Sequence, residues 1–198
     1  IRARLAEALA LRRAALGGLP HSYRLAHSEA DGLPGAVVDV FGDHVVVQIA
    51  TAGMDRRRAE LLDAVRELLS PAAVIERSDV PFRALEGLAE PKGVLFGEPR
   101  LPCRVEENGV VLFADLLEGQ KTGYYLDQAR NRALARPLLA GRRVLDLFCY
   151  VGAWSLVAAD AGASSVLAID SSARALELAG EALALRPDLA PRVTFEKT

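Results

Sequence analysis

The segment from Val144 to Ser172 constrains the fold of this chain more than any other. It reads VLDLFCYVGAWSLVAADAGASSVLAIDSS: an apolar strand, a loop with one glycine, a helix, and a second apolar strand that closes on an acid. This order predicts a β-α-β unit of a doubly wound sheet, in which ligands bind outside the carboxyl ends of the strands. Asp146 and Asp170 stand at those ends. We therefore expect both carboxylates to face one crevice. The alternative is an ordinary buried unit, but two acids are costly to place there without a partner.

The acid after the second strand indicates a nucleoside ligand. A carboxylate there can accept hydrogen bonds from both hydroxyls of a ribose, each worth roughly 1.5 to 3 kcal/mol. A dinucleotide site would need G-x-G-x-x-G, because a pyrophosphate must approach the backbone closely. Here Phe148 and Tyr150 stand where small residues are expected, and only Gly152 remains. A ligand without phosphates fits better, with an amino acid end near Asp146 and a ribose near Asp170. S-adenosylmethionine has this shape.

Further motifs lie upstream of this unit. Residues 115–132 read DLLEGQKTGYYLDQARNR, residues 29–43 read EADGLPGAVVDVFGD, and residues 76–88 read ERSDVPFRALEGL. On these motifs the chain resembles the class I S-adenosylmethionine-dependent methyltransferases that modify large-subunit ribosomal RNA, in the branch that makes 5-methylcytosine. That family carries GQKTGxYLDQRxNR, VLDxFxYxGxF and VxxVDxS, which recur here in order and spacing. The resemblance covers nearly the whole chain.

The resemblance implies that residues 119–128 fold over the cofactor. Its implied contacts in that segment are Lys121, Thr122, Tyr125 and Asp127. With the residues of the β-α-β unit, the predicted cofactor site also contains Asp146, Phe148, Tyr150, Gly152, Asp170 and Ser171. GQKTG is not a phosphate-binding loop, because Gln120 separates Gly119 from Lys121. Without the resemblance, Lys121 and Asp127 would suit a solvated surface pair of negligible energy. Ala129 replaces an arginine of the family pattern, so the contact of that arginine is not expected here.

The chain contains two cysteines. Methylation of cytosine at C5 requires a thiolate that attacks C6. Neither Cys103 nor Cys149 matches the nucleophile position of the family, so we expect both to be packed thiols. No catalytic residue is therefore predicted among these 198 residues. The resemblance implies that an Asp-Pro-Pro motif and a cysteine-bearing loop lie beyond Thr198. We expect a fragment that lacks the N-terminal RNA-binding domain and the C-terminal catalytic half.

Two domains are predicted. Residues 1–114 form an α+β central domain on the RNA side, and residues 115–198 form the first part of a truncated α/β Rossmann-like methyltransferase domain. A helix should end at Gly17 and Gly18, and Asp55 should cap a later helix. Strands are expected at 36–41, 45–49, 73–76, 94–96, 104–106 and 110–114. Tight turns are expected at 42–43 and 108–109.

Composition limits the partners and the compartment. Two cysteines suggest a reducing compartment, no apolar run approaches the roughly 20 residues of a membrane helix, and we expect a cytoplasmic protein. The three histidines have no metal-ligand spacing, so no metal is predicted. A net charge of −2 gives no global signature of nucleic-acid binding. Large-subunit ribosomal RNA would then contact a local patch, with arginines at 2, 4, 12, 13 and 56–58 as candidates, although a solvated helix face fits these arginines equally well.

Two other functions stay open from the sequence. One is a non-catalytic RNA-binding module that retains a nucleoside pocket. The other is a methyltransferase acting on the N2 amino group of guanine, which needs no thiol. The sequence also leaves a homodimer open.

Overall fold

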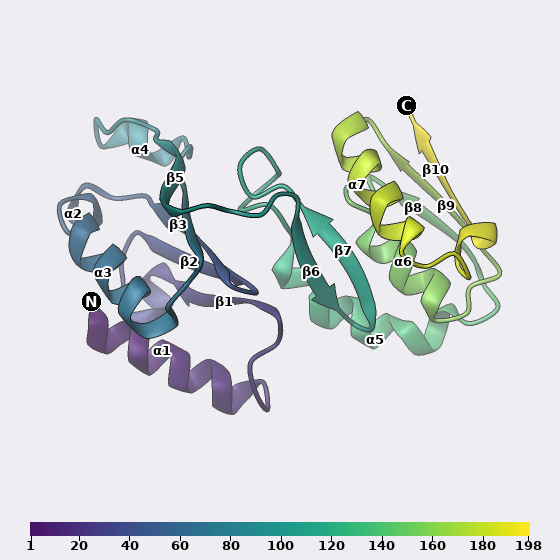
Figure 1. Cartoon of the computed structure of the whole chain (residues 1–198), viewed down its shortest axis with the longest axis horizontal. Helices are drawn as coiled ribbons and strands as arrows, with labels where there is room; N and C mark the ends of the chain where they lie inside the picture. Colours follow the sequence, from purple (N-terminus) through teal and green to yellow (C-terminus); the bar gives the residue numbers. More distant parts are fainter. The chain divides into compact units, whose positions relative to one another are not determined.

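A computed structural model describes all 198 residues, which form two compact units (Figure 1). The first unit contains Ile1–Leu101 and Leu116–Gly123, and the second contains Pro102–Asp115 and Tyr124–Thr198. This division differs from the predicted boundary at residue 115 in two segments. The hairpin before that residue belongs with the second unit, and the loop after it belongs with the first.

The first unit is built on a five-stranded sheet of order β1-β2-β3-β4-β5. All neighbouring strands are antiparallel except β3 and β4, which are parallel. Its elements are α1 (Arg2–Ala15), β1 (Ser22–His27), η1 (Ser28–Asp31), β2 (Ala36–Phe41), β3 (His44–Ile49), α2 (Ala52–Asp55), α3 (Arg58–Leu69), β4 (Ala73–Arg77), α4 (Phe82–Leu85) and β5 (Lys92–Gly97).

Two amphipathic helices supply the core on one face of this sheet. Leu5 and Leu9 of α1 and Leu61 and Val65 of α3 share one buried cluster with strand residues such as Val47. Apolar side chains spaced three and four apart line one side of a helix, which explains why these positions turn inward.

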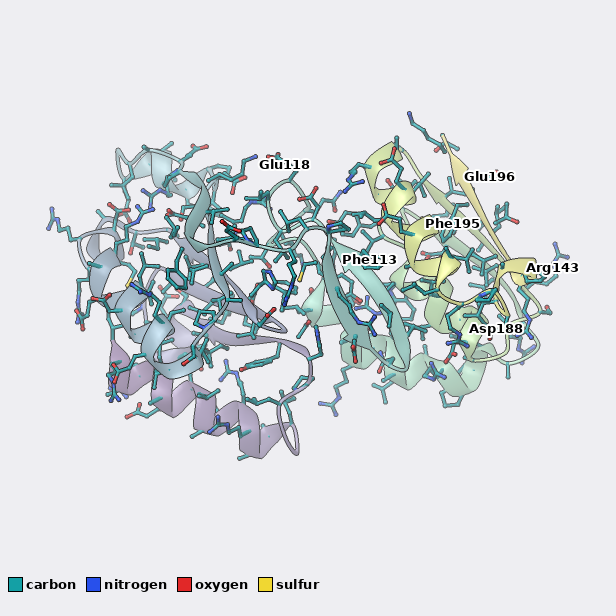
Figure 2. All side chains as sticks on the ribbon, viewed as in Figure 1. Phe113, Glu118, Arg143, Asp188, Phe195 and Glu196 are labelled. Carbon is teal, nitrogen blue, oxygen red and sulfur yellow. The ribbon has the colours of Figure 1, made fainter.

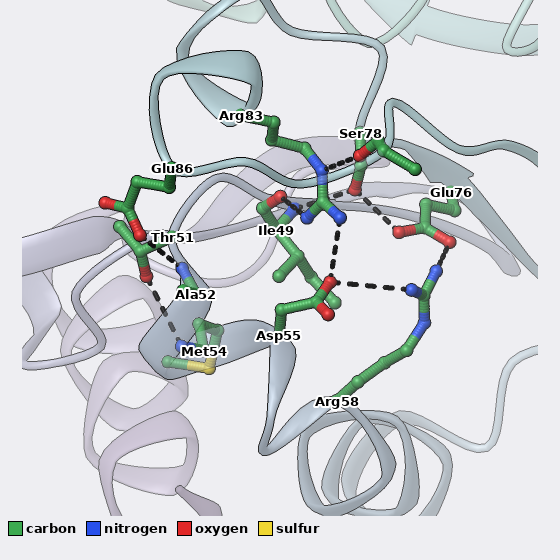
Figure 3. Close-up of polar contacts among 11 residues, drawn as sticks. Ile49, Thr51, Ala52, Met54, Asp55, Arg58, Glu76, Ser78, Arg83 and Glu86 are labelled. Carbon is green, nitrogen blue, oxygen red and sulfur yellow. Dashed lines mark hydrogen bonds and ion pairs between the residues drawn. The ribbon is translucent and has the colours of Figure 1, made fainter.

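Buried charged side chains fasten the loop after β4 to this unit (Figure 3). The Arg83 side chain is almost fully buried and donates hydrogen bonds to the backbone carbonyl oxygens of Ile49 and Ala89 and to the Asp55 carboxylate. Arg58 pairs with Asp55 and with the buried Glu76. No buried side-chain nitrogen or oxygen atom lacks a hydrogen-bond partner. The motif at residues 76–88 therefore has a structural role.

Two further side chains anchor the segment Leu116–Gly123 to the first unit. Arg77 donates hydrogen bonds to the carbonyl oxygens of Leu116 (3.3 Å) and Gly119 (2.9 Å). Asp39 is fully buried and accepts a 2.7 Å hydrogen bond from the hydroxyl of Thr122. These contacts explain why the segment belongs with the first unit although it follows the hairpin in sequence.

The second unit combines a parallel three-stranded sheet of order β10-β9-β8 with an antiparallel hairpin of β6 and β7. Helices α6 and α7 connect the parallel strands and lie along them (Figure 1). This arrangement confirms the predicted Rossmann-like character. The elements are β6 (Cys103–Glu107), β7 (Val110–Ala114), η2 (Leu126–Gln128), α5 (Ala129–Leu139), β8 (Arg143–Leu147), α6 (Ala153–Asp160), β9 (Ser165–Asp170), α7 (Ala173–Ala184), η3 (Ala190–Arg192) and β10 (Val193–Lys197).

Two local expectations are corrected. The strand β1 was not predicted, because its sequence SYRLAH carries charged and polar residues on both faces. Asp55 does not cap the helix that follows it, since it is the last residue of α2, where Thr51 caps the N-terminus through a 3.3 Å bond from the Met54 amide. The helix α3 begins after Arg57 without a side-chain cap.

None of the helices combines the length and apolarity that a membrane crossing requires.

Candidate functional site

Asp146 and Asp170 lie on the same face of the parallel sheet. Asp146 of β8 is directly opposite Ala168 of β9, and Asp170 follows two residues later at the carboxyl end of β9. Side chains two residues apart in a strand point to the same side. The two carboxylates therefore lie on the same side of the sheet at its carboxyl edge, which the predicted shared crevice requires.

Asp170 closes the loop between the two strands. Its Oδ2 accepts a 2.8 Å hydrogen bond from the backbone amide of Tyr150, and its Oδ1 accepts one of 2.8 Å from the amide of Ser172. An ionised carboxylate has about four acceptor positions. Each oxygen of Asp170 thus retains capacity for one more donor, which is what a pair of ribose hydroxyls requires.

Asp146 is held in a partly buried position by α6. Its Oδ2 accepts a 2.6 Å hydrogen bond from the Ser155 hydroxyl. Burial raises the pKa of the Asp146 carboxyl, Ser155 opposes the rise, and the charge of Asp170 adds to it. A positively charged ligand group beside these two acids would relieve both the burial cost and their repulsion.

The loop between β8 and α6 holds an unusual backbone. Phe148 (φ 61°), Tyr150 (φ 51°) and Gly152 (φ 71°) are all left-handed, at alternate positions. A side chain in this region costs roughly 1 to 2 kcal/mol. Two aromatic residues therefore occupy backbone conformations that suit glycine, and Phe148 leaves 88% of its surface exposed. Strain of this kind is concentrated at ligand sites.

Gly152 is required by space as well as by backbone conformation. A Cβ atom at this position would lie 3.1 Å from the Cβ of Ala179 and 3.0 Å from the ring of Phe195 on β10 (Figure 2). Any larger residue would push the loop away from α7 and β10. The single glycine of the loop thus allows the start of α6 to lie close to α7 and β10.

A buried arginine supports this loop from the side. Arg132 of α5 forms a bidentate ion pair with Glu107 (2.5 and 2.7 Å) and donates hydrogen bonds to the Tyr124 hydroxyl (3.0 Å) and the Tyr125 carbonyl (3.1 Å). The Tyr125 ring in turn meets the Tyr150 ring edge-on, with centroids 5.6 Å apart. Arg132 therefore joins the β6–β7 hairpin to the aromatic side of the candidate site.

Comparison with known proteins identifies the family. A profile described as S-adenosylmethionine-dependent methyltransferase matches residues 86–196. This chain belongs to that family. A curated relative from Shewanella denitrificans, named Ribosomal RNA large subunit methyltransferase I, is 43% identical over 164 residues, covering 82% of this chain and 41% of the relative. One of the same name from Tolumonas auensis is 41% identical over 178 residues, covering 89% and 45%. The chain thus spans about two fifths of the length of these relatives.

Solved structures show the same fold. One solved structure is of a Streptococcus mutans protein whose name suggests a SAM-dependent methyltransferase. It superposes with a TM-score of 0.83 at 24% identity, covering all of this chain and 51% of that one. The structure named as the complex of aTrm5 and tRNALeu superposes with a TM-score of 0.63 at 25% identity, covering 79% of this chain and 45% of that one. The described units therefore have the architecture of methyltransferases.

The predicted contacts are divided between the two units. Tyr125 and Asp127 lie in the second unit together with Asp146, Phe148, Tyr150, Gly152, Asp170 and Ser171, whereas Lys121 and Thr122 lie in the first. The buried hydroxyl of Thr122 is engaged with Asp39, which gives this residue an anchoring role that was not predicted. Ser171 is exposed, and it is Ser172 that caps α7 by accepting a bond from the Ala175 amide. Asp127 is exposed and accepts a bond from the Gln128 side chain.

The second unit also contains supporting residues that the sequence analysis did not single out. Ser155 fixes Asp146, and Arg132 with Glu107 fixes the tyrosines of the matched segment. Arg132 belongs to the family pattern around residues 119–132, which was a usable signal. Glu107 carries no signal of its own, because its partner Arg132 is 25 positions away. Ser155 lies only nine positions from Asp146, but no motif marks a serine there as its partner.

Both cysteines of the chain are buried and free. Burial raises the pKa of the Cys149 thiol to about 12, and the charges of Asp146 and Asp170 add to this rise. At neutral pH Cys149 is therefore a protonated thiol rather than a nucleophile. His, Cys, Asp and Glu side chains form no group of three or more that could hold a metal ion.

Proposed function

We propose that this chain carries the cofactor half of an enzyme that methylates C5 of a cytosine in large-subunit ribosomal RNA. The observation that carries the proposal is the pair of carboxylates at adjacent strand ends, in a chain whose curated relatives are named as methyltransferases of that RNA. The motifs at residues 115–132 and 144–172 support the cytosine branch through their resemblance to it. The tRNA complex of a structural neighbour supports an RNA substrate.

The proposal assigns a role to each candidate site residue of the second unit. Asp170 accepts the two ribose hydroxyls with its remaining lone pairs, while the amides of Tyr150 and Ser172 hold its orientation. Asp146 receives the ammonium end of the amino acid part and is fixed by Ser155. Phe148, Tyr150 and Tyr125 enclose the ligand, Gly152 permits its close approach, and Ser171 and Asp127 lie at the margin of the site.

S-adenosylmethionine supplies an electrophilic methyl group when it is bound. The residues of this chain bind and orient it, and the two acids provide negative charge near a cationic ligand. The covalent step at C6 of cytosine requires a thiolate. The proposal gives that step to neither Cys149, which is protonated, nor Cys103, which is buried and donates its thiol hydrogen to the Arg104 carbonyl oxygen.

Methyl transfer measured on the protein expressed from its complete coding sequence tests this function. Unmodified large-subunit ribosomal RNA would be incubated with methyl-labelled S-adenosylmethionine and digested to nucleosides. Label in 5-methylcytidine is the expected result. Label in N2-methylguanosine would favour the guanine enzyme, and RNA binding without any transfer would favour the non-catalytic module.

A further inference from the structure

A cavity lies within the first unit, and its lining shares no residue with the candidate site. Its volume is about 340 Å³, within the range of roughly 300 to 1,000 Å³ typical of ligand pockets. It opens where the last turns of α1 and α3 meet the turn between β2 and β3. Its apolar wall consists of Leu9, Val40, Val45, Leu68, Leu69 and Pro71.

Two donors of this cavity have no partner within the protein. The Tyr23 side chain is only 8% exposed, yet its hydroxyl makes no hydrogen bond although it lines the cavity. Burial raises the pKa of this hydroxyl and the nearby charge of Arg13 opposes the rise, so the group stays protonated at neutral pH. Arg13 forms no ion pair, whereas its neighbour Arg12 is held by a bidentate pair with Asp31. No fully buried side-chain oxygen lacks a partner, so the Tyr23 hydroxyl reaches the surface of the cavity, where it is free to donate to a ligand that accepts hydrogen bonds.

The rest of the rim limits what can enter. The His21 ring lies over Gly42, where a Cβ atom would be 2.9 Å from its Nε2, so the glycine makes room for the ring. The Asp43 carboxylate is already occupied by Arg100 and by His44 Nδ1, the latter at 2.8 Å. The uncompensated charge of the cavity is therefore the positive charge of Arg13.

We propose that this cavity binds one unpaired nucleotide of the RNA substrate, with the base against the apolar wall and a phosphate beside Arg13. The Tyr23 hydroxyl and the His21 ring donate to acceptors on the edge of the base. Proteins recognise RNA sequence mainly through unpaired bases that are splayed out and contacted on their edges, and phosphate contacts from arginine fix the register. This inference rests on the proposed function, since it takes the substrate to be RNA.

Paired variants test the two donors. Tyr23→Phe removes only the hydroxyl, and Arg13→Met removes the charge but keeps a long side chain. Arg4→Met is the matched control, because Arg4 is an exposed residue of the same helix that pairs with Glu7 outside the cavity. Affinity for unmodified large-subunit ribosomal RNA would be measured at several salt concentrations. We expect a loss of about 3- to 10-fold for Tyr23→Phe and about 10- to 100-fold for Arg13→Met, and a salt slope reduced by about 1 for Arg13→Met only.

Crosslinking locates the contact independently of affinity. RNA containing 4-thiouridine would be irradiated with the protein, and the crosslinked peptide identified after trypsin. We expect the peptide of residues 14–24, which carries His21 and Tyr23 between two cleavage sites at arginine. Crosslinks confined to other peptides would overturn the proposal. A second outcome would also overturn it: Arg13→Met weakens the binding of nucleoside monophosphates but leaves the affinity for RNA unchanged.

The affinity of each variant for S-adenosylhomocysteine distinguishes a failure of the cavity proposal from a failure of the proposed function. If the parent binds S-adenosylhomocysteine but no RNA, the proposed function fails. If the parent binds RNA and all three variants bind it equally well, only the cavity proposal fails. Cavity variants that change S-adenosylhomocysteine affinity or unfold at lower denaturant would show a structural role instead, which also contradicts the proposal.

Discussion

Charged side chains are buried in both units, but they have different partners in the two. In the first unit, Arg83 and Arg58 pair with Asp55, Arg58 also pairs with Glu76, and Arg83 donates to nearby carbonyl oxygens (Figure 3). In the second unit, Asp146 and Asp170 lie near each other as like charges and retain acceptor capacity, beside a loop with left-handed aromatic residues. The comparison contrasts charges that hold a fold with two charges that we propose bind a ligand.

Removal of one charge from the buried ion pairs of the first unit should have the largest effect on the free energy of unfolding. Arg83→Met leaves the carbonyl oxygens of Ile49 and Ala89 without their donor inside a buried site. We expect a loss of about 3 to 5 kcal/mol in the free energy of unfolding. Denaturant unfolding followed by circular dichroism measures this loss. The exposed Arg4→Met variant should change it by less than about 0.5 kcal/mol. Equal midpoints for the two variants would show that the network is not structural.

Neutralisation of Asp146 in the second unit should raise the free energy of unfolding instead of lowering it. The folded-state pKa of Asp146 lies above its ordinary value of 3.8, so its ionised form costs folding free energy at neutral pH. This cost is absent below the unfolded-state pKa and appears as pH rises through the interval between the two values. We expect Asp146→Asn to stabilise the protein by roughly 1 kcal/mol at pH 7, as substitutions at strained functional sites commonly do.

Unfolding curves at several pH values check this sign. The advantage of Asp146→Asn should shrink as pH falls toward 3.8. A variant that is less stable than the parent at pH 7 would place Asp146 with the structural charges, and the contrast between the units would be lost.

The smallest expected effect concerns the strained loop. Phe148→Gly removes a left-handed strain of about 1 to 2 kcal/mol, and the flexibility of glycine offsets about 0.5 to 1 kcal/mol of this gain. We expect a net stabilisation of about 0.5 kcal/mol, although a large side chain is deleted. Phe148→Ala is the control, because it deletes the same ring but retains a Cβ atom at positive φ. Equal stability of the two variants would mean that the loop stores no strain.

The sequence predicted the local elements better than the assignment of segments to units. Alternating apolar residues and the Asn108–Gly109 pair were sufficient for the hairpin of β6 and β7. Its place in the second unit depends on the ion pair of Arg132 with Glu107, across 25 positions, which no local pattern reveals. The strand ends at Asp146 and Asp170 were predictable because parallel strands fix their shared edge. The anchoring of Thr122 by Asp39 was not, since it joins residues 83 positions apart.

The central claim is that Asp170 binds the ribose of a methyl-donating nucleoside. Calorimetry with S-adenosylhomocysteine tests it on the parent, on Asp170→Asn, and on Asp188→Asn, an exposed control in the same unit (Figure 2). Charge-assisted hydrogen bonds are roughly twice as strong as neutral ones. We therefore predict that Asp170→Asn weakens binding by at least about tenfold while Asp188→Asn leaves it unchanged. Equal affinity of the two variants would contradict the account.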